Sequence, residues 1–373
     1  MPKESYNLKP AERAVLTLRN LYRAYGYLHY KVSKFEEYDL YMRNKSFLAD
    51  ENVLTFTDTD GRLLALKPDI TLSIIKNAKD ADAGPRKVYY NENVYRTAGG
   101  GFKEIMQTGL ECIGHIDAYA VCEVVLLAYE SLACLGGSFL LDLSHMGFVS
   151  GLLEEMQAGE ETAAQLLHAV GEKNAAAIRE ICAGAGVDAG LAEDLCTTAL
   201  LYGPAQQVLQ SMEPLCRNAK MRAAVAELRQ LCSALETGGR EENLRLDFSV
   251  INDMNYYDGI IFQGFLESIP HSVLSGGRYD RLAEKMGKQK GAIGFAVYLD
   301  GLERAAAEEA YDVDVLLAYT AATPPDAVLR EVKALIAQGL SVKAQCGGDT
   351  GLHYRQKICL DGEEKRVCGK TSI

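Results

Sequence analysis

The sequence predicts a mixed α and β protein of two or three domains. A chain of 373 residues with 48% hydrophobic content can bury substantial cores. Residues 245–280 contain two strand-like apolar blocks, separated by the paired tyrosines Tyr256 and Tyr257. Residues 152–235 are instead rich in alanine and leucine at helical spacing. Segments that favour a sheet and segments that favour helices therefore follow one another along the chain.

Five further segments carry the periodicity of a helix or a strand. They are a helix over residues 11–24, a hairpin over 54–66, a strand over 88–96, a strand that contains 107–111, and a helix over 119–134. Near the C-terminus, a strand at 313–319, a helix at 326–338 and a strand at 341–345 predict a βαβ-like unit, to which residues 354–358 and 365–371 can add short strands.

The composition of the chain indicates which ligands it is suited to bind and in which cellular compartment it functions. The net charge of −12 repels a phosphate backbone, which disfavours a general nucleic-acid binder but leaves room for a local basic patch. We expect no secretory segment and no apolar run long enough to cross a bilayer. The ten cysteines are scattered without a CxxC pair, so we expect reduced, mostly buried thiols and no metal site. These features predict a cytoplasmic protein.

Several polar side chains are suited to a small charged ligand. Asp69 precedes an apolar run, so it is a candidate anchor for an ammonium group, a helix N-cap, or both. Arg96 offers a guanidinium fork to a carboxylate or a phosphate. Glu111 is costly to bury alone and needs either a cationic or N–H-bearing ligand, such as an imidazole, or a salt bridge within the sheet. Tyr256 and Tyr257 offer an apolar wall with a hydroxyl at its edge.

Two other features invite a functional interpretation. Gly276 and Gly277 let a ligand approach the backbone because no Cβ stands in the way, although a hairpin with a glycine turn is the simpler alternative. His145 lies at a turn after a buried strand. Because no Ser, Cys or metal-ligating residue stands near it at the spacing that a catalytic or metal site would need, we interpret it as a capping or core hydrogen-bonding residue.

The segments NYYDGIIF and SGGRYD resemble the two signatures that shape the histidine pocket of histidyl-tRNA synthetases and their relatives, among them the regulatory subunit of ATP phosphoribosyltransferase. LALKPDITLSII and KVYYNENVYR resemble the LRPEGT segment and motif 2 of those proteins, and GAIGFAVYLDGLERAAAEE resembles motif 3. The resemblance implies an α+β fold of the class II aminoacyl-tRNA synthetase type, with an antiparallel sheet flanked by helices. It implies a core at 1–148 and 244–310, a helical insertion at 149–243, and a short α/β domain, similar to an anticodon-binding domain, at 311–373.

The same resemblance implies a histidine pocket and a dimer. The implied pocket residues are Asp69, Thr71, Arg96, Gln107, Glu111, Tyr256, Tyr257, Gly276, Gly277 and Arg278. Residues 27–43 resemble motif 1, which builds the dimer interface, although the usual proline falls on Ser33.

Three departures from the synthetase pattern argue against aminoacylation. The substrate-activating arginine falls on Asn252, the motif 2 glutamate on Ala98 in a short neutral loop, and the motif 3 arginine on Gly301. Arg304 lies one helical turn beyond Gly301 and would be a displaced substitute. Stabilisation of phosphoryl charge is therefore left without its usual residues.

We therefore favour a regulatory subunit of ATP phosphoribosyltransferase with no catalytic residue, cofactor or metal. The family implies a homodimer within a hetero-octamer with the short-form catalytic subunit, L-histidine as ligand, and no contact with tRNA or membrane. Regulation then follows from linkage, because a ligand that prefers one assembly state shifts the other subunit by the difference in affinity. A working or divergent histidyl-tRNA synthetase and a histidine-binding scaffold for another partner remain the alternatives.

Overall fold

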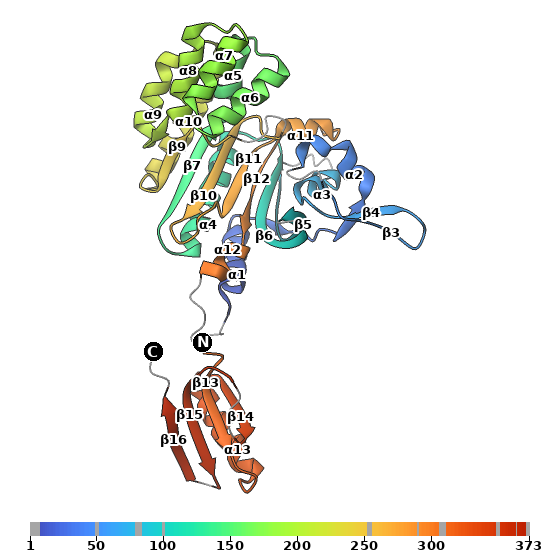
Figure 1. Ribbon diagram of the computed structural model, residues 1–373, viewed down its shortest axis with the longest axis vertical. Helices are drawn as coiled ribbons and strands as arrows, with labels where there is room; N and C mark the ends of the chain where they lie inside the picture. The colour runs from blue at the N-terminus through green and yellow to red at the C-terminus, as the bar shows by residue number, and fades with distance from the viewer. Residues whose placement is uncertain are drawn as a thin grey trace. The chain divides into compact units, whose positions relative to one another are not determined.

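The chain divides into two compact units in the computed structural model (Figure 1). One unit is Ala11–Leu302, and the other is Glu303–Ile373 with Met1–Pro10. The structure describes residues 8–48, 52–78, 84–98, 101–251, 256–288, 291–305, 311–347, 351–362 and 364–370.

A nine-stranded sheet forms the centre of the larger unit. Its strands, in spatial order, are β1 (Leu28–His29), β5 (Arg86–Ala98), β6 (Gly101–Gly114), β12 (Gly291–Tyr298), β11 (Leu274–Arg278), β10 (Ile260–Leu266), β7 (Phe139–His145), β9 (Leu244–Asp247) and β8 (Tyr202–Gly203). Neighbours are antiparallel except for the pairs β1/β5 and β7/β9. Strands far apart in the sequence, such as β6 and β12, therefore lie side by side.

One face of the sheet is covered by α1 (Pro10–Ala24) and α4 (Ala118–Leu135). The helix α4 packs against β7, β10 and β12, and the hydroxyls of Tyr22 on α1 and Ser131 on α4 are 3.0 Å apart. By length and composition α4 could cross a membrane, which corrects the expectation that no apolar run reaches that length. Its place against the sheet, with buried Glu123 paired to Lys87 at 2.6 Å, is that of a core helix.

The other face carries smaller elements. They are the sheet of β2 (Phe35–Glu37), β4 (Leu63–Leu66) and β3 (Thr55–Thr57), the helices α2 (Tyr38–Arg43), α3 (Thr71–Lys76) and α11 (Asp280–Lys285), and the turn η1 (Lys45–Phe47). The short helix α12 (Asp300–Ala305) follows β12, and its Leu302 packs against the core that contains α1 and α4. The predicted hairpin is confirmed, and Gly61 takes the positive φ of 82° that its turn requires. Alternation along β10 places Ile261 in one hydrophobic core and Phe262 in the other.

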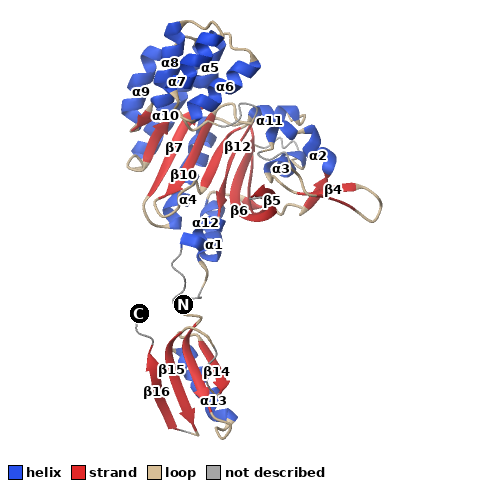
Figure 2. Cartoon of the chain, in the orientation of Figure 1, coloured by secondary structure: helices blue, strands red, loops and turns tan. Residues whose placement is uncertain are grey.

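Helices dominate residues 146–237 (Figure 2). They are α5 (Met146–Glu155), α6 (Glu160–Gly171), α7 (Ala175–Gly184), α8 (Ala189–Leu200), α9 (Ala205–Met212) and α10 (Ala219–Thr237), with the short turn η2 (Glu213–Leu215). Asn174 and Asp188 cap α7 and α8. The helix α10 packs on α4 and α5, and Leu228 belongs to the same core cluster as the sheet.

The smaller unit contains the predicted βαβ arrangement. Its elements are β13 (Val313–Tyr319), α13 (Pro325–Ala337), β14 (Val342–Cys346), β15 (Tyr354–Asp361) and β16 (Glu364–Lys370), with strand order β14-β13-β15-β16. Val315, Leu317 and Leu335 form its core with Ile358 and Leu360. Cys359 and Cys368 form a disulfide between β15 and β16, so the expectation of reduced thiols is wrong for this pair. The antiparallel pairing of β15 with β16 brings together these two cysteines, which lie nine residues apart in the sequence.

The α+β architecture predicted from the sequence is confirmed. It consists of a large, mainly antiparallel sheet flanked by helices, and a separate small sheet unit.

Candidate functional site

A small cavity lies on the sheet face that carries α3. It has a volume of about 120 Å³. Its walls are Phe47, Leu48, Asp69, Ile70, Thr71, Tyr90, Arg96, Gln107, Glu111, Tyr256, Tyr257, Ser275, Tyr279, Gly294, Phe295, Ala296 and Tyr298. The structure thus brings together seven of the ten residues expected to bind a ligand.

Glu111 on β6 is the buried carboxyl group of this cavity. Its side chain accepts hydrogen bonds from the Thr71 hydroxyl at 2.7 Å and from the Tyr279 hydroxyl. Burial raises the pKa of Glu111 to about 8, although the hydrogen bonds from Tyr279 and Thr71 act in the opposite direction. An empty cavity therefore favours a protonated Glu111 near neutral pH, and a cationic or N–H-bearing ligand favours the carboxylate.

Asp69 lines the cavity and bonds to the first turn of α3, and its role as an anchor for an ammonium group stays a prediction. Its carboxylate accepts the backbone N–H of Leu72 at 2.8 Å and so caps the first turn of α3, while the residue also lines the cavity. Burial raises the pKa of Asp69, and the N–H of Leu72 and the charge of Arg96 oppose this shift. Arg96 lines the cavity from β5, and its Nε donates to the carbonyl of Pro68 at 2.9 Å.

Gln107 presents an unused hydrogen-bond donor to the cavity. The side chain is only 3% exposed, and its Nε2 has no partner within the described chain. A buried amide nitrogen without a partner costs about 1 to 3 kcal/mol. A ligand that supplies an acceptor atom would therefore recover this free energy.

Aromatic rings form another part of the cavity wall. The ring centroids of Tyr256 and Tyr257 are 4.6 Å apart, and Tyr279 lies 6.0 Å from Tyr256 and 6.4 Å from Tyr257. Phe47 extends the wall at 6.4 Å from Tyr256. This arrangement suits a small polar ring.

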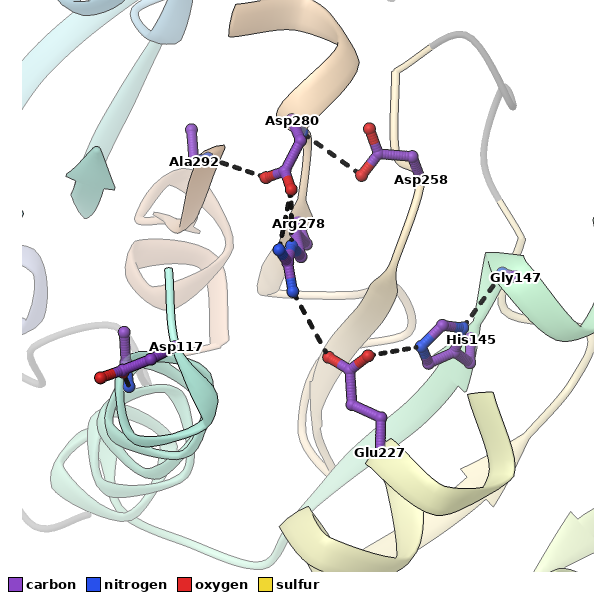
Figure 3. A network of polar contacts seen from close by, with 9 residues as sticks. Asp117, His145, Gly147, Glu227, Asp258, Arg278, Asp280 and Ala292 are labelled. Carbon is purple, nitrogen blue, oxygen red and sulfur yellow. Dashed lines mark hydrogen bonds and ion pairs between the residues drawn. The ribbon is translucent and has the colours of Figure 1, made fainter. Parts of the chain in front are cut away.

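Gly276, Gly277 and Arg278 do not line the cavity. A Cβ on Gly276 would overlap Phe295 and the Gly294 carbonyl, and one on Gly277 would lie 2.7 Å from the Tyr257 ring. These glycines therefore leave room for neighbouring side chains and strands. The Arg278 guanidinium bonds to Asp280 at 2.8 Å, outside the cavity (Figure 3).

His145 has the capping role predicted for it. Its Nδ1 accepts the backbone N–H of Gly147 at 3.0 Å at the start of α5, which leaves the proton of the neutral ring on Nε2. That nitrogen lies 3.2 Å from Glu227 Oε2 on α10 (Figure 3). The hydrogen bond from His145 lowers the pKa of Glu227.

Sequence reasoning missed Tyr279, Tyr90 and Gly294. Tyr279 directly follows Arg278 in the SGGRYD segment, so the motif contained a signal for it. Tyr90 belongs to an alternating strand whose inward face was not assigned. Gly294 gives no signal by itself, because its importance depends on Glu111 in the neighbouring strand.

The departures from synthetase chemistry are partly visible. Asn252 lies outside the described residues, as do the side chains of Ala98 and Arg304. Gly301 is described, and a Cβ there would lie 3.3 Å from Ile269 and 3.4 Å from His271 Nε2. A larger side chain at this position would need these neighbours to shift.

The donor set of the cavity suits an amino-acid zwitterion. Asp69 and Glu111 can accept from N–H groups, Arg96 and Gln107 can donate to a carboxylate, and the tyrosines can pack against a ring. In the described ranges, no three His, Cys, Asp or Glu side chains come together as a metal site. The cavity can therefore bind and orient a small ligand through hydrogen bonds and aromatic packing.

Fold and cavity together define a protein of the class II aminoacyl-tRNA synthetase type with an amino-acid-sized site. The family model for histidyl-tRNA synthetase matches residues 2–302. A solved structure described as an ATP phosphoribosyltransferase regulatory subunit/histidyl-tRNA synthetase from Bacillus halodurans has a TM-score of 0.78 and 25% identity, over 97% of this chain and 99% of that one.

The chain belongs to the family of ATP phosphoribosyltransferase regulatory subunits. It is 30% identical over 358 residues to the regulatory subunit of Acetivibrio thermocellus, which covers 92% of this chain and 85% of the relative. A chain of the ATP phosphoribosyl transferase (HisG:HisZ) complex from Thermotoga maritima shares the fold, with a TM-score of 0.62 and 18% identity over 78% of this chain and 98% of that one.

Proposed function

We propose that this chain is a non-catalytic regulatory subunit of ATP phosphoribosyltransferase and that its cavity binds L-histidine. The unpaired amide of Gln107 in the same cavity as buried Glu111 is the observation that carries the proposal, because one ligand can accept from the amide and donate to the carboxylate. In this arrangement the ammonium group of histidine faces Asp69, its carboxylate faces Arg96, and an imidazole N–H reaches Glu111. The family relationship supports the same ligand class.

Histidine binding is tested by the thermal midpoint of the purified chain. A ligand that binds only the native state raises the midpoint, by an amount that grows with ligand concentration. We expect histidine to raise it and Glu111→Ala or Tyr256→Ala to abolish the rise. Absence of a shift in the parent protein contradicts the ligand assignment.

The partner in this proposal is the short-form catalytic subunit, with a homodimer of this chain inside a hetero-octamer in the cytoplasm. The named relatives support the partner. Residues 27–43 are the proposed dimer element, and Leu28 on edge strand β1 is 72% exposed. Mixing this chain with the catalytic subunit should stimulate phosphoribosyl-ATP synthesis, and histidine should reduce it. Lack of stimulation would instead favour a histidine-binding scaffold for another partner.

A histidyl-tRNA synthetase is the competing function, because the matching family model carries that description. Gly301 favours the regulatory subunit, since its surroundings leave little room for the arginine that the synthetase pattern needs. Pyrophosphate exchange and aminoacylation assays separate the two. We expect neither activity, no phosphoribosyl-ATP synthesis by this chain alone, and no stable complex with tRNA or membranes.

A further inference from the structure

Tyr279 reaches the cavity from a backbone that is held on both sides. The side chain is 2% exposed, and its hydroxyl donates to Glu111. Its own N–H donates to the carbonyl of Ala292 at 2.8 Å, and the carbonyl of Arg278 accepts the N–H of Asp258 at 3.1 Å. The position of the hydroxyl therefore depends on how this short segment is anchored.

Arg278 is the charged anchor of that segment (Figure 3). Its Nε and Nη2 both approach Asp280 Oδ2, at 2.9 and 2.8 Å. The other oxygen of Asp280 accepts the N–H of Ala292 at 2.9 Å. The guanidinium thus joins the end of β11 to the start of β12 around Tyr279.

A third contact extends the anchor to the helices. Arg278 Nη1 lies 3.9 Å from Glu227 Oε1 on α10, and Glu227 Oε2 is held by His145. On the far side, Asp258 accepts the N–H groups of Asp280 and Arg281 at the start of α11. Arg278 therefore lies between α10 and the turn that carries Tyr279, and every one of its charged partners lies outside the cavity.

We propose that Arg278 is a positioning residue for the ligand cavity, which acts by fixing the Tyr279 hydroxyl against Glu111 and by tying this contact to α10 through Glu227. The proposal deepens the proposed function, and only its ligand-binding consequence rests on that function. Loss of the anchor moves Tyr279 away from Glu111, and the carboxylate of Glu111 then loses a hydrogen-bond donor.

The titration of Glu111 reports on this contact, because a donor that bonds to the carboxylate lowers its pKa. Other groups act on the same carboxyl, and all of them except Tyr279 itself stay unchanged in the variants. The ionisable residues whose charges couple to Glu111 are Asp69 before α3, Tyr27 after α1, Tyr90 on β5, Cys112 on β6, and Tyr256, Tyr257 and Tyr279.

The experiment measures the Glu111 midpoint in the ligand-free full chain by carboxyl ¹³C chemical shift, assigned with Glu111→Gln. Tyr279→Phe removes the hydroxyl and should raise the midpoint by roughly one pH unit, since a hydrogen bond to a charged group is lost. Arg278→Gln should raise it in the same direction. A purely structural role would lower the thermal midpoint and leave the Glu111 titration unchanged.

Arg217→Gln is the matched control. It removes an ion pair with Asp194 in the helices, with Nε 2.6 Å from Oδ2, away from the cavity. If Arg278→Gln does not fold, Arg278→Lys is decisive, because it keeps the charge but loses the planar fork. An upward shift in Arg278→Lys supports the proposal, and an unchanged Glu111 midpoint in a folded Arg278 variant overturns it, as does no shift in Tyr279→Phe.

Histidine affinity of the same variants gives the functional consequence. The dissociation constant at pH 7 should rise about 5- to 20-fold in Arg278→Gln, comparable to Tyr279→Phe. Weaker histidine binding than wild type in both variants, together with the raised Glu111 titration midpoint, supports the proposal. If the parent chain binds no histidine, the proposed function fails while the ligand-free titration still decides the role of Arg278.

Discussion

Gly294 on β12 lies directly opposite Glu111 on β6, and a side-chain carbon at Gly294 would overlap the Glu111 carboxylate. The missing side chain lets the carboxylate lie over the neighbouring strand, where Thr71 and Tyr279 donate to it. The position of the cavity carboxylate on β6 therefore depends on a glycine in the adjacent strand β12.

Gly294→Ala should displace Glu111 and remove the histidine-dependent rise in thermal midpoint. Overpacking a close contact costs about 1 to 3 kcal/mol, so the variant should also be less stable. Differential scanning fluorimetry with and without histidine measures both effects. Gly101→Ala is the control, because a Cβ there meets nothing within 4 Å. Retention of the histidine shift in Gly294→Ala would contradict this role.

Glu111→Gln should change how stability depends on pH. The folded pKa of about 8 lies above the ordinary value of 4.5, so the native state binds more protons than the unfolded state between these values. The stabilisation that the protonated Glu111 gives the native state is therefore fully present below pH 4.5 and is lost as the pH rises towards 8. Relative to the parent, the free energy of unfolding of Glu111→Gln should increase by on the order of a few kcal/mol as the pH rises from 5 to 8. Urea unfolding at several pH values measures the difference, and parallel curves would refute the prediction.

Asp142 and Asp247 should respond in opposite ways to replacement by asparagine. Burial raises the pKa of Asp142 to about 6, and its Oδ1 has no partner among the described residues. Its unfavourable charge develops as the pH rises from 4 to 6. Asp142→Asn should therefore be more stable than the parent at pH 7, and this difference should shrink at pH 4. Asp247 is satisfied by Ser249 and by Lys173 at 3.0 Å, so Asp247→Asn should cost about 1 to 3 kcal/mol at pH 7. Equal effects of the two substitutions in urea unfolding would exclude this distinction.

Buried Lys67 and half-buried Glu92 should behave as a coupled pair. The Lys67 side chain is 1% exposed and lies 2.7 Å from Glu92, which also accepts the N–H of Val32 at 3.2 Å. Lys67→Met should cost about 3 to 5 kcal/mol because it leaves a carboxylate unpaired. The double variant with Glu92→Gln should recover part of this loss. A double-mutant cycle by chemical denaturation tests the coupling, and additive losses would disprove it.

Local patterns predicted the elements well where periodicity was strong. The helical spacing of residues 11–24 and 119–134 corresponds to α1 and α4, and the alternation of residues 88–96 lies within β5. The strand expected around residues 107–111 corresponds to β6, from which Gln107 and Glu111 both line the cavity. These predictions hold because helix and strand periods depend on residues close together in the sequence.

The residues that the sequence expected in the cavity but the structure places outside it depend on relationships between strands. Gly276 and Gly277 suggested ligand approach, but Phe295 and Tyr257 occupy the space beside them. Arg278 pairs outward with Asp280, whereas the next residue, Tyr279, lines the cavity. A glycine shows that a side chain is absent, but the residues opposite it decide what fills the space.

The sequence by itself determined the element types, the family motifs and the polar residues Asp69, Gln107 and Glu111 that define the site. Only the tertiary structure decided that Gly294 and Tyr279 complete that site and that Arg278 anchors it from outside. The reason is physical: composition and period act along the chain, whereas strand order sets which side chains meet, and β6 and β12 become neighbours only when the sheet forms.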